Sequence, residues 1–170
     1  MNQELAGRDV PLDAVLHTGC GVVHAYWDGL RGGRFAPAWG EFQLIDLPAA
    51  IIPYMRVTDV IDGGRDFVYR FWGTGLSFVR AFDRTGMRLA GIDSPRTATA
   101  LSEYRRVIEE KAPLARVYDA RAHLHGTSLH APCIRLPLSS DGETVDKIAC
   151  YTDFETDSAD WRQYFDKSKR

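Results

Sequence analysis

Hydrophobic residues follow two different periods along the chain. At residues 12–30 and 94–111 they recur every three or four positions, which predicts two amphipathic helices. The first of these contains Gly19 and Gly21, which weaken a helix interior, so we expect its firm part to begin near Gly21. Elsewhere apolar and polar residues alternate, which predicts five strands. The expected strands are Met55–Ile61, Phe67–Phe71, Ala115–Leu124, Leu129–Leu138 and Val145–Thr152.

Short turns separate the predicted strands. Residues 62–64 lie between the first two strands, and residues 125–127 and 140–142 separate the last three. Strands joined by such turns pair as antiparallel neighbours. Two strands, a helical block and three further strands favour an α+β fold, with an antiparallel sheet covered by helices on one face. We divide the chain into an N-terminal helical arm (1–33), the α+β domain (34–153) and a short C-terminal helix (154–170) that carries Trp161 and Phe165.

The composition narrows the class of protein. The 21 Lys and Arg residues nearly balance the 23 Asp and Glu residues, and the net charge of −2 lacks the basic excess typical of nucleic-acid-binding proteins. Three widely spaced cysteines, Cys20, Cys133 and Cys150, are typical of reduced thiols rather than of a disulfide framework. The first residues contain no basic region followed by an apolar run, so we expect no secretory signal. No apolar run reaches the length of a membrane span. We therefore expect a cytoplasmic protein that binds neither nucleic acid nor membrane.

Several short motifs occur in a fixed order within residues 22–153. They are AYWDGLR at 25–31, DFVYRFWGT at 66–74, FDRTG at 82–86, and LPL at 136–138 followed by Asp141-Gly142. This ordered set resembles PAS domains, in particular a bacterial, PAS_5-like family whose members stand alone or nearly so. The resemblance implies a five-stranded antiparallel sheet in the order 2-1-5-4-3, with helices packed on one face and an N-terminal amphipathic helix. It also implies a sensory or signalling module rather than an enzyme, and we assign no catalytic residue.

Large side chains of the second strand and the helical block are expected to face one another. Phe67, Tyr69 and Phe71 alternate toward the helices, whereas Arg70 and Trp72 point outward or toward another element. Because ligand sites are mostly apolar, this arrangement predicts a cavity for a small apolar molecule; a solid core without a cavity is the alternative. The candidate ligand-binding residues are Phe67, Tyr69, Phe71, Phe78, Phe82, Tyr104, Ile108, Ile148 and Cys150.

No cofactor is assigned, and both haem and flavin are disfavoured. Flavin photosensors of this kind carry a reactive cysteine in an Asn-Cys-Arg-Phe type motif, which the sequence lacks. Histidine-ligated haem usually draws its ligand from the helix before the last three strands, and residues 94–111 contain no histidine. Tyr104 could ligate iron, but a tyrosine on a helix face is more often part of a core.

Two groups of histidines are candidate metal sites. His123, His125 and His130 gather near one predicted turn, where imidazoles could hold zinc or nickel, although no carboxylate or cysteine lies close to them in sequence. A solvent-facing strand end on which histidines alternate is the preferred explanation. The other group is His17, Cys20 and His24, which the flank of an amphipathic helix explains. We therefore assign no metal.

The N-terminal helix is the candidate surface for partners. Its apolar anchors predict a homodimer, or contact with a signalling protein, unless the helix covers its own sheet. These anchors are Leu16, Val23, Tyr26, Trp27 and Leu30. The alternative function is a small enzyme with a cone-shaped α+β fold like that of ketosteroid isomerases, using Asp59, Tyr69 or His130 in an apolar pocket. In those folds most helices precede the sheet, whereas here two strands precede the main helix.

Overall fold

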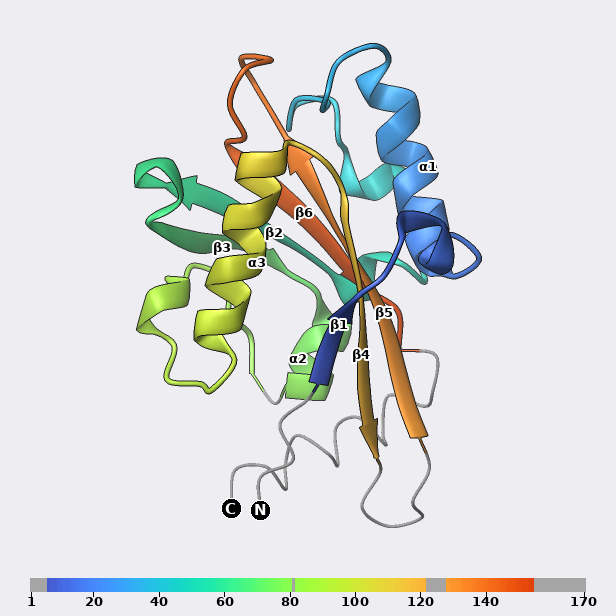
Figure 1. Cartoon of the computed structure of the whole chain (residues 1–170), viewed down its shortest axis with the longest axis vertical. Helices are drawn as coiled ribbons and strands as arrows, with labels where there is room; N and C mark the ends of the chain where they lie inside the picture. Colours follow the sequence, from blue (N-terminus) through green and yellow to red (C-terminus); the bar gives the residue numbers. More distant parts are fainter. Residues whose placement is uncertain (1–5, 81, 122–127, 155–170) are drawn as a thin grey trace.

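The computed structural model describes residues 6–80, 82–121 and 128–154. Six strands form one antiparallel sheet in the order β1-β4-β5-β6-β2-β3 (Figure 1). The strands are β1 (Ala6–Asp9), β2 (Met55–Ile61), β3 (Asp66–Trp72), β4 (Leu114–Arg121), β5 (Ser128–Leu138) and β6 (Lys147–Thr152). The α-helices are α1 (Gly19–Arg31), α2 (Thr74–Arg80) and α3 (Thr97–Glu110). Short 3-10 turns lie at Leu12–Val15, Leu44–Asp46, Ile52–Tyr54, Asp62–Gly64 and Leu89–Gly91.

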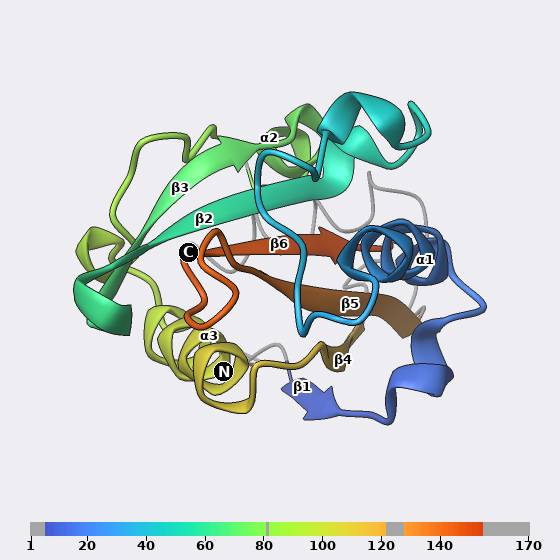
Figure 2. The same cartoon turned by 90° about the horizontal axis from the view of Figure 1, so that it is seen from above.

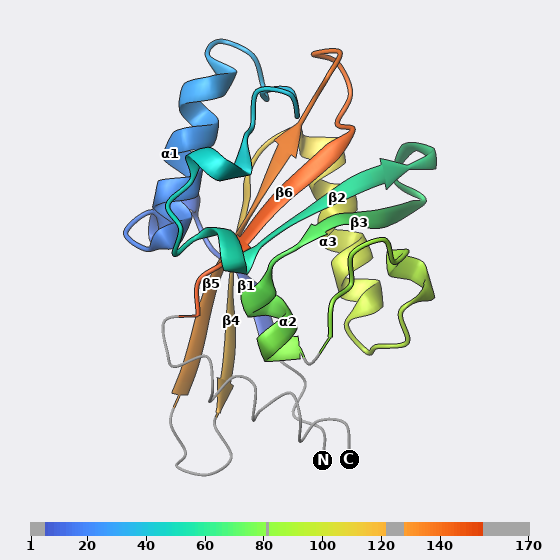
Figure 3. The same ribbon diagram turned by 180° about the vertical axis from the view of Figure 1, so that it is seen from behind.

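The α+β class and the relative order of the five predicted strands are confirmed. Strands β3-β2-β6-β5-β4 follow the predicted order 2-1-5-4-3, so the fold is PAS-like. The predicted turn at 62–64 joins β2 to β3, with positive φ angles at Asp62, Gly63 and Gly64. Figure 3 shows this hairpin at one side of the sheet and α2 directly after β3. The predicted C-terminal helix falls almost wholly outside the described residues.

The sixth strand, β1, was not predicted. It extends the sheet beside β4, and charged side chains hold it there. The Asp9 carboxylate lies 2.6 Å from Arg106 Nη1 of α3 and 2.5 Å from Arg116 Nη1 of β4. Arg8 adds an ion pair with Asp119 at 3.2 Å. Residues 6–9 contain no apolar alternation, so periodicity could not reveal a strand that pairs through its backbone and its charges.

Helices cover both faces of the sheet, which corrects the prediction of one covered face. Val23 and Trp27 of α1 pack with Val57 of β2 and with Ile134 and Leu136 of β5 in one buried cluster. A second buried cluster joins residues of α2 and α3 to Phe67, Tyr69, Ile148 and Cys150. Because side chains alternate along a strand, these two clusters lie on opposite faces. Figure 2 shows α1 and α3 well apart, with β5 passing between them.

The first predicted helix is interrupted before α1 begins. A 3-10 turn over Leu12–Val15 precedes α1. Thr18 caps α1, and its Oγ1 accepts a hydrogen bond from the Cys20 backbone N–H at 3.2 Å. The α-helix therefore starts at Gly19, close to the predicted firm part.

A β-bulge in β3 changes which side chains face α2 and α3. Val57 pairs with Phe71 and Thr58 pairs with Tyr69, so Arg70 is the extra residue on β3. The bulge places Phe71 with the cluster under α1 and Trp72 with the cluster under α2 and α3. The predicted orientations of Phe71 and Trp72 are therefore wrong, because an alternating pattern cannot reveal an inserted residue.

Candidate functional site

A cavity of about 60 Å³ lies between the sheet and the segments that form α2 and α3. Its floor comes from strands β2, β3, β4, β5 and β6, and its other walls come from α2, the loops after it and the start of α3. The lining residues are Arg56, Tyr69, Trp72, Leu76, Arg80, Arg84, Leu89, Ser94, Arg96, Thr97, Ala100, Tyr104, Tyr118, Ala131, Arg135, Thr152 and Phe154.

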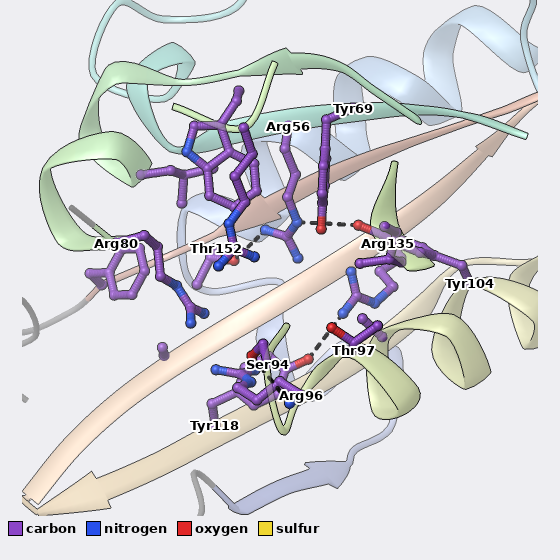
Figure 4. Close-up of a pocket in the computed structure, with 17 residues that line it drawn as sticks. Arg56, Tyr69, Arg80, Ser94, Arg96, Thr97, Tyr104, Tyr118, Arg135 and Thr152 are labelled. Carbon is purple, nitrogen blue, oxygen red and sulfur yellow. Dashed lines mark hydrogen bonds between the residues drawn. The ribbon is translucent and has the colours of Figure 1, made fainter. Parts of the chain in front are cut away.

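Five arginines line this cavity. Arg56 and Arg135 come from β2 and β5, Arg80 from the end of α2, Arg84 from the loop that follows, and Arg96 from the residue before α3. Figure 4 draws these side chains around a common space and labels all of them except Arg84. No aspartate or glutamate occurs among the described lining residues. The lining is therefore strongly cationic, which corrects the predicted apolar cavity.

One buried carboxylate lies next to this arginine cluster. Glu103 of α3 pairs with Arg135 and, at 3.0 Å, with the Nε of Arg116. Tyr118 donates its hydroxyl to the two carboxylate oxygens at 3.1 and 3.0 Å. Burial by itself raises the pKa of Glu103, but Arg135 and Arg116 outweigh burial, and the pKa lies below its ordinary value. Glu103 is therefore an ionised internal counter-charge for one of the five arginines.

Hydrogen bonds and ring contacts fix the two arginines of the sheet. Arg56 donates to Thr152 Oγ1 at 2.9 Å and to the Tyr104 hydroxyl at 3.4 Å. The Arg135 guanidinium lies 4.6 Å from the centre of the Tyr104 ring and donates to the Tyr118 hydroxyl at 3.1 Å. These contacts hold both guanidinium groups on the cavity floor and allow them little freedom.

Burial disfavours the charged form of two arginines of the opposite wall. Burial lowers the pKa of Arg80 well below its ordinary value, and the cations of Arg96, Arg84 and Arg56 lower it further. Burial also lowers the pKa of Arg96, and Tyr118 and Glu103 offset only part of this effect. Arginine nevertheless keeps its proton in proteins, so the walls stay charged.

Several hydrogen-bond donors of the lining are buried and unpaired. Within the described part of the chain, no hydrogen-bond partner is found for Trp72 Nε1, Arg84 Nε, Arg96 Nη1 or Arg135 Nε. Buried donors are nearly always satisfied in folded proteins. Ring contacts support two of these cations: Arg84 lies 5.2 Å from the Trp72 ring centre, and Arg96 lies 4.7 Å from that of Tyr118. The lining thus offers donors that an acceptor-rich ligand would satisfy.

The structure brings only two of the nine predicted ligand-binding residues to the cavity. These are Tyr69 and Tyr104. Phe67, Ile148 and Cys150 are buried in the same cluster, where they pack but do not line the cavity, and Ile108 is half-buried against that cluster. Phe71 belongs to the opposite face, and Phe78 and Phe82 are 43% and 40% exposed.

Sequence reasoning missed the arginines. Arg56 stands between the buried Met55 and Val57, and Arg135 stands between the buried Ile134 and Leu136. An arginine inside an apolar strand is seldom buried unless it is paired, so these two positions carried a usable signal. Arg80, Arg84 and Arg96 lie in helical and loop segments where arginine is common, and no comparable signal marked them.

Among the described residues, the candidate metal and catalytic sets are not brought together. His123 and His125 lie outside the described residues, and His130 is an exposed residue whose Nδ1 lies 2.5 Å from Asp119. No group of three His, Cys, Asp or Glu residues in the described ranges could hold a metal ion, which covers His17, Cys20 and His24. Of the alternative catalytic set, Asp59 pairs with Arg70 at 2.7 Å, away from the cavity, and neither Asp59 nor His130 lines it.

The N-terminal helix uses its apolar side chains on its own sheet. Val23 and Trp27 are buried, and Trp27 Nε1 donates to the Pro137 carbonyl at 2.8 Å. Tyr26 packs on Phe42 with 5.2 Å between ring centres, and the partly buried Leu30 belongs to the same cluster. Of the five predicted interface anchors, only Leu16 is exposed, at 38%. Val23 and Trp27 therefore pack against the chain's own sheet, which is the alternative to an interface that the sequence left open.

Similar folds occur among solved structures. A light-oxygen-voltage domain studied with a flavin analogue is 12% identical, with 68% of this chain and 84% of that chain covered and a TM-score of 0.42. The light-state structure of the blue-light photoreceptor Aureochrome1 LOV is 11% identical, with 69% of this chain and 92% of that chain covered and a TM-score of 0.40. An RNA-binding light-oxygen-voltage receptor is 11% identical, with 96% of this chain and 42% of that chain covered and a TM-score of 0.44. With such TM-scores, these likenesses carry no argument about this chain's ligand.

No family model matches the sequence, and no curated protein matches it. Among the described helices, none combines the length and the apolar character that crossing a membrane requires.

Proposed function

We propose that this chain is a PAS-type sensory module that binds a small anion in the cavity between its sheet and α2–α3. The observation that carries the proposal is the convergence of five arginines on one cavity whose described lining contains no carboxylate. Guanidinium groups bind carboxylates and phosphates through paired, charge-assisted hydrogen bonds. The ligand is therefore anionic rather than apolar as the sequence suggested.

The energetics of the cavity favour an anion. Burial, and after it the neighbouring arginines, lower the pKa values of Arg80 and Arg96, because charges that are removed from water lose hydration and repel one another. Within the described part of the chain, Glu103 pairs with one of the lining arginines, Arg135. A bound anion would reduce the repulsion and would accept hydrogen bonds from the unpaired donors of Arg84, Arg96 and Arg135.

A chain of ion pairs offers a route for an output signal. Arg135 on the cavity floor pairs with Glu103 of α3, Glu103 pairs with Arg116 of β4, and Arg116 pairs with Asp9 of β1. An anion that binds Arg135 competes with Glu103 for the same guanidinium. This competition would shift the positions of α3 and of the edge strand β1. A signalling partner or a second copy of the chain would recognise the shifted elements.

A flavin does not fit this site. The first neighbour described above was studied with a flavin analogue. In this chain no cysteine is found among the described lining residues: Cys20 belongs to the opposite face, and Cys133 and Cys150 are buried within the sheet. The volume of about 60 Å³ corresponds to roughly five water molecules, which is small for a three-ring cofactor.

The test compares anion binding by the wild type, Arg96→Met and Arg65→Met. Arg96 is a lining residue, whereas Arg65 is exposed and outside the cavity, so Arg65→Met is a matched control. We expect calorimetric titration with small carboxylates and phosphate to show saturable binding by the wild type and the control. Binding should weaken at least about tenfold in Arg96→Met, the loss of about 1.4 kcal/mol or more expected for one charged hydrogen bond.

Removing one cation relieves repulsion, so Arg96→Met should be at least as stable as the wild type in the absence of ligand. This behaviour separates lost binding from lost folding. Absence of anion binding by the wild type, or equal binding by Arg96→Met, would refute the proposal.

A further inference from the structure

We propose that the anion is a small dicarboxylate of four or five carbons that carries no ammonium group. This inference rests on the proposed anion-binding function and names the class of ligand. It follows from four properties of the cavity: the number of cations, their placement on two walls, the positions of the unpaired donors and the shape of the remaining lining.

The number of charges requires more than one negative group. Five arginines line the cavity, and Glu103 is the buried carboxylate that pairs with one of them, Arg135. Even with Arg80 left out of the count, Arg56, Arg84 and Arg96 have no ion pair with a carboxylate among the described residues, and a monocarboxylate would balance only one of these three charges. A doubly charged ligand balances twice as much charge and is correspondingly favoured.

The cations lie on two walls rather than at one point. Arg56 and Arg135 rise from the sheet, whereas Arg80 and Arg96 come from the end of α2 and the segment before α3. Figure 4 shows the side chains of Arg56, Arg135, Arg80 and Arg96 on different sides of one space. A ligand with a carboxylate at each end can contact both walls at once, and a compact ion such as phosphate cannot do so equally well.

Unpaired donors are available at both walls. Within the described residues, Arg135 Nε and Trp72 Nε1 belong to strands of the sheet, and Arg96 Nη1 and Arg84 Nε belong to the opposite loops. Arg135 and Trp72 are 3% and 7% exposed, so an acceptor for these donors has to lie inside the cavity. Carboxylate oxygens at the two ends of one molecule would satisfy donors on both sides.

The rest of the lining selects against amino acids and accepts a short carbon chain. No described lining residue carries a carboxylate that could pair with an ammonium group. Tyr69, Trp72 and Tyr104 provide ring surfaces against which methylene groups can pack. The cavity volume of about 60 Å³ corresponds to roughly five waters, which is on the order of 150 Å³ of liquid and suits a molecule of roughly eight to ten non-hydrogen atoms.

The experiment titrates the full chain at constant ionic strength with acetate, phosphate, malonate, succinate, glutarate, adipate and aspartate. We expect succinate or glutarate to bind at least about tenfold more tightly than acetate or phosphate, and affinity to fall for the shorter malonate and the longer adipate. Aspartate, which differs from succinate by one ammonium group, should bind at least about tenfold more weakly than succinate.

Arg96→Met and Arg65→Met provide the matched test of two-ended binding. Arg96→Met removes a cation from one wall, so it should weaken succinate binding much more than acetate binding, whereas Arg65→Met should change neither. If acetate, phosphate and succinate bind equally, the dicarboxylate inference is overturned while anion binding stands. Succinate and aspartate binding equally would also overturn it. If no anion binds, both proposals fail.

Discussion

Replacing Glu103 with glutamine tests the idea of an internal counter-charge. The Glu103 side chain is 3% exposed and contacts Arg135, Arg116 and the Tyr118 hydroxyl. Glutamine has almost the same shape, keeps one oxygen acceptor and removes the negative charge. The substitution therefore leaves a cluster of buried arginines without its carboxylate and changes the packing little.

The expected loss of stability follows from these contacts. Breaking a buried ion pair by removing one partner costs about 3–5 kcal/mol, because the remaining charge stays buried and unpaired. Since glutamine can still accept one hydrogen bond from Tyr118, we expect the free energy of unfolding to fall by about 3 kcal/mol, the lower end of this range. For a chain of this size that loss lowers Tm by roughly 6–12 °C.

The effect of Glu103→Gln should depend on pH. The pKa of Glu103 is lower in the folded protein than in the unfolded chain. Its ion pairs therefore stabilise the fold above the unfolded value of about 4.3, and this stabilisation is lost as the pH falls through the folded pKa. The free energies of unfolding of the wild type and Glu103→Gln should differ most near pH 7 and converge in acid.

Urea unfolding followed by circular dichroism at several pH values measures this difference. Glu110→Gln is the control, because Glu110 lies on the same helix and forms an exposed ion pair with Arg106 at 3.4 Å, worth less than about 1 kcal/mol. If Glu103→Gln were as stable as the wild type at pH 7, or if the difference did not change with pH, the assignment of Glu103 as a charged counter-ion would be refuted.

Three further substitutions or deletions test the fold. Trp27→Phe removes the 2.8 Å hydrogen bond to the Pro137 carbonyl, and we expect urea unfolding to show a loss of about 1–3 kcal/mol; an unchanged midpoint would contradict this. Gly73→Ala places a Cβ 2.2 Å from the Pro53 oxygen and should lower the free energy of unfolding by about 1–3 kcal/mol or more; unaltered Tm would show that the backbones can move apart. Deleting residues 1–31 removes α1 from the sheet, so we expect loss of the folded state by circular dichroism; a folded monomer would instead support the N-terminal region as a homodimer interface.

The strand arrangement could be predicted because its signals are local. Alternating apolar residues mark β2, β3, β4, β5 and β6, and short turns determine which of them pair directly. The PAS resemblance then supplied the order in which the two groups of strands join. Strand β1 escaped prediction because residues 6–9 have no hydrophobic face and are held by charges far away in the sequence.

Individual side-chain directions were less predictable. In β3 the extra residue Arg70 reverses the alternation after Tyr69, so Trp72 reaches the cavity and Phe71 does not. The bulge arises from how β3 pairs with β2, and the pattern of residues within β3 does not predict it. The burial of Val23 and Trp27 likewise depends on the sheet face that α1 covers.

The amino-acid sequence by itself determined the α+β class, the antiparallel hairpins and the two main amphipathic helices, because propensity, period and turn chemistry act over a few neighbouring residues. Only the tertiary structure decided the chemistry of the cavity. Arg56, Arg80, Arg84, Arg96 and Arg135 are spread over 80 positions and several elements, and each alone is an ordinary charged residue. Electrostatic interaction depends on distance in space, and that distance is set when the sheet and the helical layer close on each other.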